Sequence, residues 1–107
     1  MRVNLIKPDE LEKTLEADPT FLIIDIRDDD VYSAMRLPYE NVLHLPLAYL
    51  EEKLSEIPEG KKLIIACHYG KQSITAVPYL SSKGYDVQGC LDGGIMGWQK
   101  AGKPVRN

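Results

Sequence analysis

The sequence predicts an α/β protein in which helices cover both faces of a mostly parallel sheet of five strands. Short apolar runs alternate with amphipathic stretches along the whole chain, the order that repeated strand–helix units produce. Two runs, residues 21–26 ("FLIIDI") and 62–67 ("KLIIAC"), are almost continuously apolar, as strands buried on both faces of a parallel sheet are. We found no internal repeat and no linker, so residues 1–107 are predicted to form one domain.

The first half of the chain is predicted to begin with a strand and a short helix. Residues 3–6 form a weak strand. Residues 7–17 form a helix because Pro8 suits a first helical turn and because Leu11 and Leu15 lie on one helical face. This face would pack on the sheet.

Two further strand–helix units are predicted before residue 60. Residues 21–26 form a buried strand that is followed by a helix over about 28–35. Residues 42–46 form the third strand, and residues 47–57 are predicted to be a helix because their apolar residues recur every three or four positions. These apolar residues are Leu47, Leu50, Leu54 and Ile57.

The second half contains the strand predicted most strongly, residues 62–67. The helix over 73–84 is expected to end at Gly84, in the position that a left-handed cap prefers. Residues 85–91 form a fifth strand, and residues 93–102 form the last helix.

Composition and charge exclude several classes of protein. With 107 residues, 44% of them hydrophobic and 27% charged, the chain can bury a core without disulfides or metals. The net charge is −3 and the charges are dispersed, which argues against a nucleic-acid or membrane partner. No apolar run approaches the roughly 20 residues of a membrane span, and the N-terminal residues become charged too early for a signal peptide. We therefore expect a cytoplasmic protein.

The cysteines and histidines favour neither a disulfide nor a metal site. Cys67 and Cys90 are the two cysteines, and a reducing compartment would keep both as thiols. His44 and His68 are too far apart in sequence to match a zinc-site spacing. No metal and no other cofactor is expected.

Cys67 is the candidate reactive residue because it ends the predicted strand 62–67. In parallel sheets, ligands bind beyond the carboxyl ends of strands, where helix N-termini favour negative charge. The amides of the following loop and the charge of Lys71 would stabilise a thiolate, which is the reactive form of cysteine. Gly70 allows a tight turn, and Ser73 can cap the helix or donate a hydrogen bond to sulfur. We expect Cys67 on an exposed loop.

Several of these residues also have structural interpretations. A cysteine at the end of a buried strand often only packs, and a loop histidine such as His68 can have no role or can supply charge near neutral pH. We interpret Cys90 as an inert core thiol and His44 as a packed or hydrogen-bonded histidine.

Three more residues are expected to support the fold. Asp25 and Arg27 can pair or brace the loop, or Asp25 can cap the next helix. Trp98 looks like an aromatic anchor for the last helix.

Four sequence stretches together resemble the rhodanese family, in its single-domain form. They are "DIRDDDVY" (25–32), "LP" (37–38), "CHYGKQS" (67–73) and "LDGGIMGW" (91–98). Their order and spacing cover almost the whole chain. Each stretch is weak evidence alone, but the cysteine loop combined with the Gly-Gly-Ile…Trp tail is specific.

The resemblance implies a three-layer α/β/α fold, strand order 1-5-4-2-3 and an active loop over residues 67–72. Family members carry a sulfane sulfur as a cysteine persulfide, from a small-molecule donor such as thiosulfate to a thiophilic acceptor. The acceptor is cyanide in vitro and a small thiol or a thiol protein in the cell. By this resemblance Cys67 is the nucleophile, and backbone amides of the loop bind the persulfide and the donor's oxygens. These amides belong to His68, Tyr69, Gly70, Lys71, Gln72 and Ser73.

The sequence also departs from the family pattern. Val31 replaces a frequent acidic residue, and residues 35–40 ("MRLPYE") replace a Gly-His-Ile-Pro-Gly-Ala stretch, which affects local geometry more than chemistry. Gln72 stands where arginine is frequent, which removes a charge that would help to bind thiosulfate. Pro78 lies inside the predicted helix at a cost of about 3 kcal/mol, so we expect a kink there or an irregular first turn.

Two alternative functions stay open on this reasoning. The dual-specificity phosphatases resemble rhodaneses, but phosphatase and arsenate reductase chemistry needs an arginine six positions after the cysteine. Ser73 occupies that position. The other alternative is a rhodanese-like module that binds or regulates a partner without turnover, which the missing arginine favours and which Cys67 and Lys71 argue against.

Overall fold

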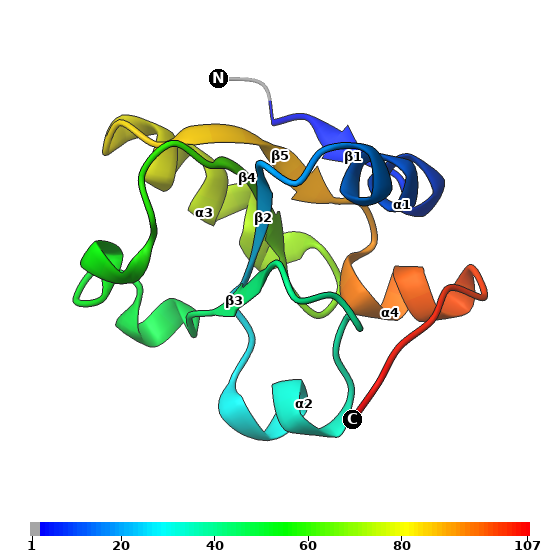
Figure 1. Cartoon of the computed structure of the whole chain (residues 1–107). Helices are drawn as coiled ribbons and strands as arrows, with labels where there is room; N and C mark the ends of the chain where they lie inside the picture. Colours follow the sequence, from blue (N-terminus) through cyan, green and yellow to red (C-terminus); the bar gives the residue numbers. More distant parts are fainter. Residues whose placement is uncertain (1–2) are drawn as a thin grey trace.

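The computed structural model describes residues 3–107, which form a five-stranded parallel sheet (Figure 1). The strand order is β1-β5-β4-β2-β3, as predicted, and every neighbouring pair is parallel. The strands are β1 (Leu5–Ile6), β2 (Phe21–Asp25), β3 (Val42–His44), β4 (Lys62–Ala66) and β5 (Asp86–Leu91).

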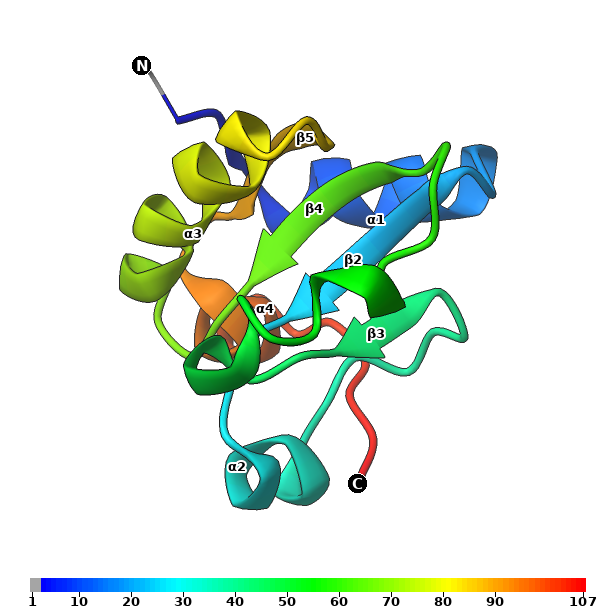
Figure 2. The same ribbon diagram turned by 90° about the vertical axis from the view of Figure 1, so that its left-hand side faces the viewer.

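Helices cover both faces of this sheet, so the predicted three-layer architecture is confirmed. One face packs against α1 (Pro8–Ala17) and α4 (Gly94–Lys100), and the other packs against α3 (Lys71–Ser82). Figure 2 shows α3 and α1 on opposite sides of β4 and β2. The short helix α2 (Asp29–Ala34) buries no side chain and lies beyond the arrowheads of these strands.

The continuous apolar runs of β2 and β4 follow from this double coverage. Ile24 of β2 is paired with Ile65 of β4, and both contribute to the core on the α3 side. The preceding pair, Ile23 and Ile64, contributes to the core on the α1 side. Successive side chains of a strand point to opposite faces, so a strand covered on both faces needs an apolar residue at every position.

The prediction of one helix over residues 47–57 is wrong, because this segment forms two separate 3₁₀ turns. They are η1 (Leu47–Tyr49) and η2 (Leu54–Glu56). The buried side chains are Leu50 and Ile57, which directly follow the two turns. Three-residue turns also place apolar residues on one side, so the spacing of the leucines did not distinguish one helix from two turns.

The helix that follows the cysteine loop begins earlier than predicted. It starts at Lys71 rather than Ser73, directly after Gly70, whose φ is +94°. Pro78 lies within it, and the helix continues to Ser82 without a break. Gly84 adopts φ +93° after the helix, as the cap prediction requires. Both β1 and β3 are shorter than predicted.

No helix within residues 3–107 has the length and apolar character that crossing a membrane requires.

Candidate active site

Cys67 directly follows β4, at the carboxyl end of the sheet. The chain from Cys67 to Gly70 forms a short loop, and α3 begins at the next residue. Gly70 adopts a left-handed conformation, and a Cβ atom there would lie 3.2 Å from the backbone nitrogen of Gly93. A glycine is therefore required both by the turn and by the close approach of a second loop.

Two backbone amides donate hydrogen bonds to the sulfur of Cys67. The Gly70 nitrogen lies 3.1 Å from Sγ and the Ser73 nitrogen lies 3.4 Å from it. Donors aimed at a sulfur favour its anionic form. Among residues 3–107, the amides that bond to Sγ are those of Gly70 and Ser73. The other four loop amides were also predicted to bind the substrate, and this role stays a prediction. Those amides belong to His68, Tyr69, Lys71 and Gln72.

The cysteine is more deeply placed than an exposed loop suggests. Cys67 is 1% exposed, whereas the neighbouring Tyr69 is 65% exposed. The loop reaches the surface, as expected, but the side chain of Cys67 itself is buried. The sulfur is recessed because it points back among the residues of the core on the α3 side.

The N-terminus of α4 holds the other side of the loop. The Ile95 amide donates to the Cys67 carbonyl at 2.8 Å, and the Met96 amide donates to the His68 carbonyl at 3.0 Å. A Cβ atom at Gly94 would lie 2.5 Å from each of these two carbonyl oxygens. Gly94, the second glycine of the Gly-Gly pair, thus lets α4 approach and position the loop. Two adjacent glycines before the last helix are the sequence signal for this close approach.

Asp25 and Arg27 form a buried ion pair beneath this edge of the sheet. The Nη2 and Nε atoms of Arg27 lie 2.9–3.2 Å from the Asp25 carboxylate, and the Arg27 amide also donates to it. The residues are 0% and 3% exposed. The predicted pairing is confirmed. Nη1 of Arg27 has no partner among the described residues.

His44, in β3, and Trp98, in the last helix, are packed as expected. His44 Nε2 lies 2.7 Å from the Arg27 carbonyl oxygen, and the ring stacks on Tyr32 with centroids 3.9 Å apart. Trp98 is 0% exposed, and its Nε1 donates to the carbonyl of Pro104 at 2.7 Å.

Cys90 lies in β5, within the same core cluster as Cys67. It is 0% exposed, and burial raises the pKa of its thiol to about 11, with smaller contributions from Cys67 and Asp92. A thiol in this state is almost entirely protonated at neutral pH. The structure thus agrees with the interpretation of Cys90 as a core thiol.

A pocket of about 370 Å³ lies beside the cysteine loop. Two of the predicted site residues, His68 and Gln72, contribute to its wall, and Lys71 does not. The remaining wall comes from the segment between β2 and α2, from α2 itself and from η1. Its members are Ile26, Arg27, Asp28, Val31, Leu47 and Ala48.

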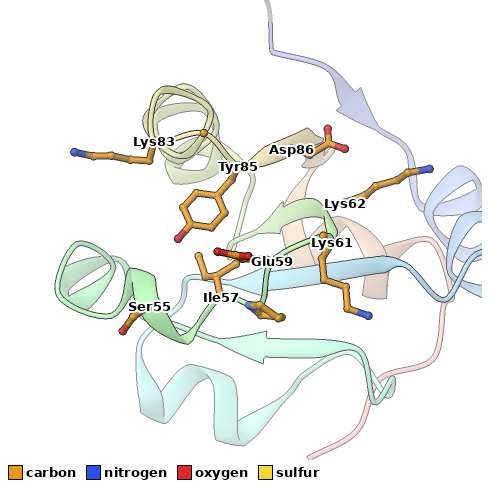
Figure 3. Close-up of a pocket in the computed structure, with 11 residues that line it drawn as sticks. Ser55, Ile57, Glu59, Lys61, Lys62, Lys83, Tyr85 and Asp86 are labelled. Carbon is orange, nitrogen blue, oxygen red and sulfur yellow. The ribbon is translucent and has the colours of Figure 1, made fainter.

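Two other pockets lie on different sides of the molecule. One of about 610 Å³ is lined by Tyr69 of the loop and by residues of α4, among them Met96 and Lys100. A larger one of about 720 Å³ lies at the amino ends of β4 and β5, with Lys61, Lys62 and Lys83 around it (Figure 3). The larger pocket is at the opposite end of the strands from Cys67, so pocket size alone does not locate the site.

Comparison with known proteins identifies the family. The Rhodanese-like domain model matches residues 7–101, so the chain belongs to the rhodanese-like family. A sulfurtransferase of Allochromatium vinosum is 32% identical over 103 residues, covering 96% of this chain and 94% of that protein.

Solved structures share the fold. A rhodanese-related protein of Thermoplasma volcanium has a TM-score of 0.83 at 26% identity, covering 96% of this chain and 97% of that one. A thiosulfate sulfurtransferase of Pseudomonas aeruginosa has a TM-score of 0.85 at 22% identity, covering 99% of this chain and 20% of that one. The second likeness shows the fold alone.

Proposed function

We propose that this protein transfers sulfane sulfur through a persulfide on Cys67. The observation that carries the proposal is the pair of amides, of Gly70 and Ser73, that donate to the Cys67 sulfur at the carboxyl end of a buried strand. Amide donors placed in this way can hold the negative charge of a sulfur nucleophile and of a persulfide. Membership of a family whose relatives include a sulfurtransferase supports the same conclusion.

The reaction consists of two half-reactions. With thiosulfate as donor, the Cys67 thiolate attacks the outer sulfur, an S–S bond forms to the enzyme, and sulfite leaves with the electron pair of the broken bond. An acceptor nucleophile then attacks the outer sulfur of the persulfide and releases the Cys67 thiolate. Cyanide yields thiocyanate, and the thiolate of a small molecule or of a protein yields a new persulfide. Neither half-reaction needs a metal or a redox cofactor.

The loop between Cys67 and α3 would also bind the donor. The amides of residues 68–73 are the donors available to its anionic oxygens, and the pocket walled by His68 and Gln72 offers an approach to the loop. The free thiols of Cys67 and Cys90 suit a reducing compartment, which supports a cytoplasmic location.

The first experiment is sulfur loading read by intact mass. Incubation with thiosulfate is expected to add the mass of one sulfur atom, and cyanide or a reducing thiol is expected to remove it. Cys67→Ser should abolish the addition, because the other cysteine of this sequence, Cys90, is buried and burial raises the pKa of its thiol to about 11. Cys90→Ala is the matched control and should load like the wild type.

Two results would contradict the proposal. Sulfur addition that persists in Cys67→Ser places the nucleophile elsewhere. A folded wild-type protein that accepts no sulfur from thiosulfate or from an inorganic polysulfide supports the alternative, a rhodanese-like module that binds or regulates a partner without turnover.

A further inference from the structure

Ser73 is a completely buried serine on the apolar face of α3. The other buried residues of this face, Ala76, Val77 and Leu80, pack in the core cluster that also contains Cys67. Ser73 is 0% exposed, so its hydroxyl does not reach solvent. Its Oγ has no hydrogen-bond partner within residues 3–107.

Packing does not explain a hydroxyl at this position. A buried hydroxyl without a partner is destabilising, because it has lost its hydrogen bonds to water and gained none in return. Ala76, one turn along the same face, fills its position without a polar atom. A buried polar group that is left unpaired in a folded protein requires a separate explanation.

The position of Ser73 relative to the nucleophile offers this explanation. Its backbone nitrogen lies 3.4 Å from the Cys67 sulfur, so Ser73 borders that sulfur, and its hydroxyl oxygen is only three bonds from the same nitrogen. The hydroxyl makes no hydrogen bond to Sγ itself. A sulfane sulfur bonded to Sγ lies about 2 Å further out, the length of an S–S bond. It brings a new, negatively charged acceptor into a site where Gly70 and Ser73 already direct their amides at Sγ.

We propose that the Ser73 hydroxyl donates a hydrogen bond to the outer sulfur of the Cys67 persulfide. This inference rests on the proposed function. The hydroxyl has no partner in the free protein and bonds to the outer sulfur in the loaded protein. The full free energy of this hydrogen bond therefore contributes to the equilibrium between the two states. Ser73 thus favours loading and retains the sulfur until an acceptor arrives.

The test measures the loading equilibrium directly. The Cys67 thiolate and thiosulfate are in exchange with the persulfide and sulfite, so the loaded fraction at fixed thiosulfate-to-sulfite ratios, read by intact mass, gives the equilibrium constant. Ser73→Ala should lower this constant about fivefold, as expected for one hydrogen bond of ordinary strength. Ser82→Ala is the matched control on the same helix, because the Ser82 hydroxyl is exposed and bonded to the Tyr79 carbonyl. It should leave the constant unchanged.

A second measurement separates this role from a structural one. Free Ser73→Ala should melt at the same temperature as the free wild type or higher, because the substitution removes an unpaired buried hydroxyl. Loading should raise the melting temperature of the wild type and raise that of Ser73→Ala less. Ser73→Thr keeps the hydroxyl and should retain the wild-type loading constant within about twofold.

The outcomes distinguish this inference from the proposed function. If the wild type and Ser73→Ala both load with the same equilibrium constant, the role of Ser73 is overturned. The proposal of sulfur transfer through Cys67 is then unaffected. Equal losses in Ser73→Ala and Ser73→Thr also overturn the role of Ser73, because volume would then explain the effect. If Ser73→Ala does not fold, the wild type decides the question. A melting temperature that loading does not raise would overturn the role of Ser73. A wild type that never loads contradicts the proposed function itself.

Discussion

Cys67 and Cys90 lie in the same core cluster and are almost equally hidden, at 1% and 0% exposure. Their surroundings differ. Cys67 directly follows β4 and receives two amide hydrogen bonds on its sulfur. Cys90 lies inside β5, where its own amide donates to the Asn4 carbonyl. Burial raises the pKa of the Cys90 thiol to about 11. Exposure therefore does not distinguish the two cysteines, whereas the amide donors at the sulfur do.

The largest expected difference between the two cysteines is in alkylation of the folded protein. Iodoacetamide at pH 7 should label Cys67 at least about tenfold faster than Cys90, because only the thiolate reacts and because a thiol with pKa near 11 is ionised in about one molecule in 10⁴ at that pH. Peptide mapping by mass spectrometry gives both rates. Labelling of Cys90 in the folded state should increase as pH rises toward 11.

The denatured protein is the control for this experiment, since both thiols should then react at similar rates. Equal rates in the folded state would contradict both the site assignment and the buried state of Cys90.

The second prediction concerns the contact that positions the Cys67 loop. Gly94→Ala places a Cβ atom on the Cys67 and His68 carbonyls in a residue with φ +65°, so we expect at least a tenfold loss of sulfur transfer and a destabilisation of about 2–3 kcal/mol. Gly102→Ala is a matched control: its φ is +80°, but a Cβ atom there meets nothing within 4 Å. It should cost about 1 kcal/mol and preserve transfer.

Denaturant unfolding and thiocyanate formation measure the two effects. If Gly94→Ala and Gly102→Ala lose transfer equally, the approach of α4 to the loop does not determine the geometry around Cys67.

The smallest predicted effects concern the charge that meets the donor. Gln72→Arg should raise kcat/KM for thiosulfate and Lys71→Ala should lower it, each by an amount on the order of 1 kcal/mol or about fivefold. We expect the gain to exceed the loss, because Gln72 borders the pocket beside the loop and Lys71 does not. Both effects should shrink as salt increases, since screening weakens exposed charges.

Steady-state kinetics at two ionic strengths test this prediction. If Lys71→Ala leaves kcat/KM unchanged at low salt, the charge of Lys71 does not contribute to donor binding. The loop amides alone would then orient the donor near Cys67.

Much of the architecture was predictable because its signals are local. The apolar runs of β2 and β4 require burial on both faces whatever packs against them, and Pro8 and Gly84 mark the ends of α1 and α3 through backbone geometry alone. Strand order came from the resemblance to a known family. Periodicity did not supply it, because pairing depends on contacts between distant parts of the chain.

The predicted helix over residues 47–57 shows where local signals fail. Leu50 and Ile57 are buried, but the chain between them turns twice and leaves residues 51–53 exposed. Spacing at three and four residues is compatible with either arrangement, so packing against the sheet decided between them.

The amino-acid sequence by itself determined that a thiol lies at the carboxyl end of a buried strand, that a glycine-containing loop follows it, and that a helix begins directly afterwards. Only the tertiary structure decided that the thiol is recessed, that Gly94 brings α4 against the loop carbonyls, and that the Ser73 hydroxyl has no partner within residues 3–107. The physical reason is that strand and turn formation depend on neighbours in sequence. Burial, close backbone approach and hydrogen-bond pairing depend on β4, α3 and α4 meeting in space.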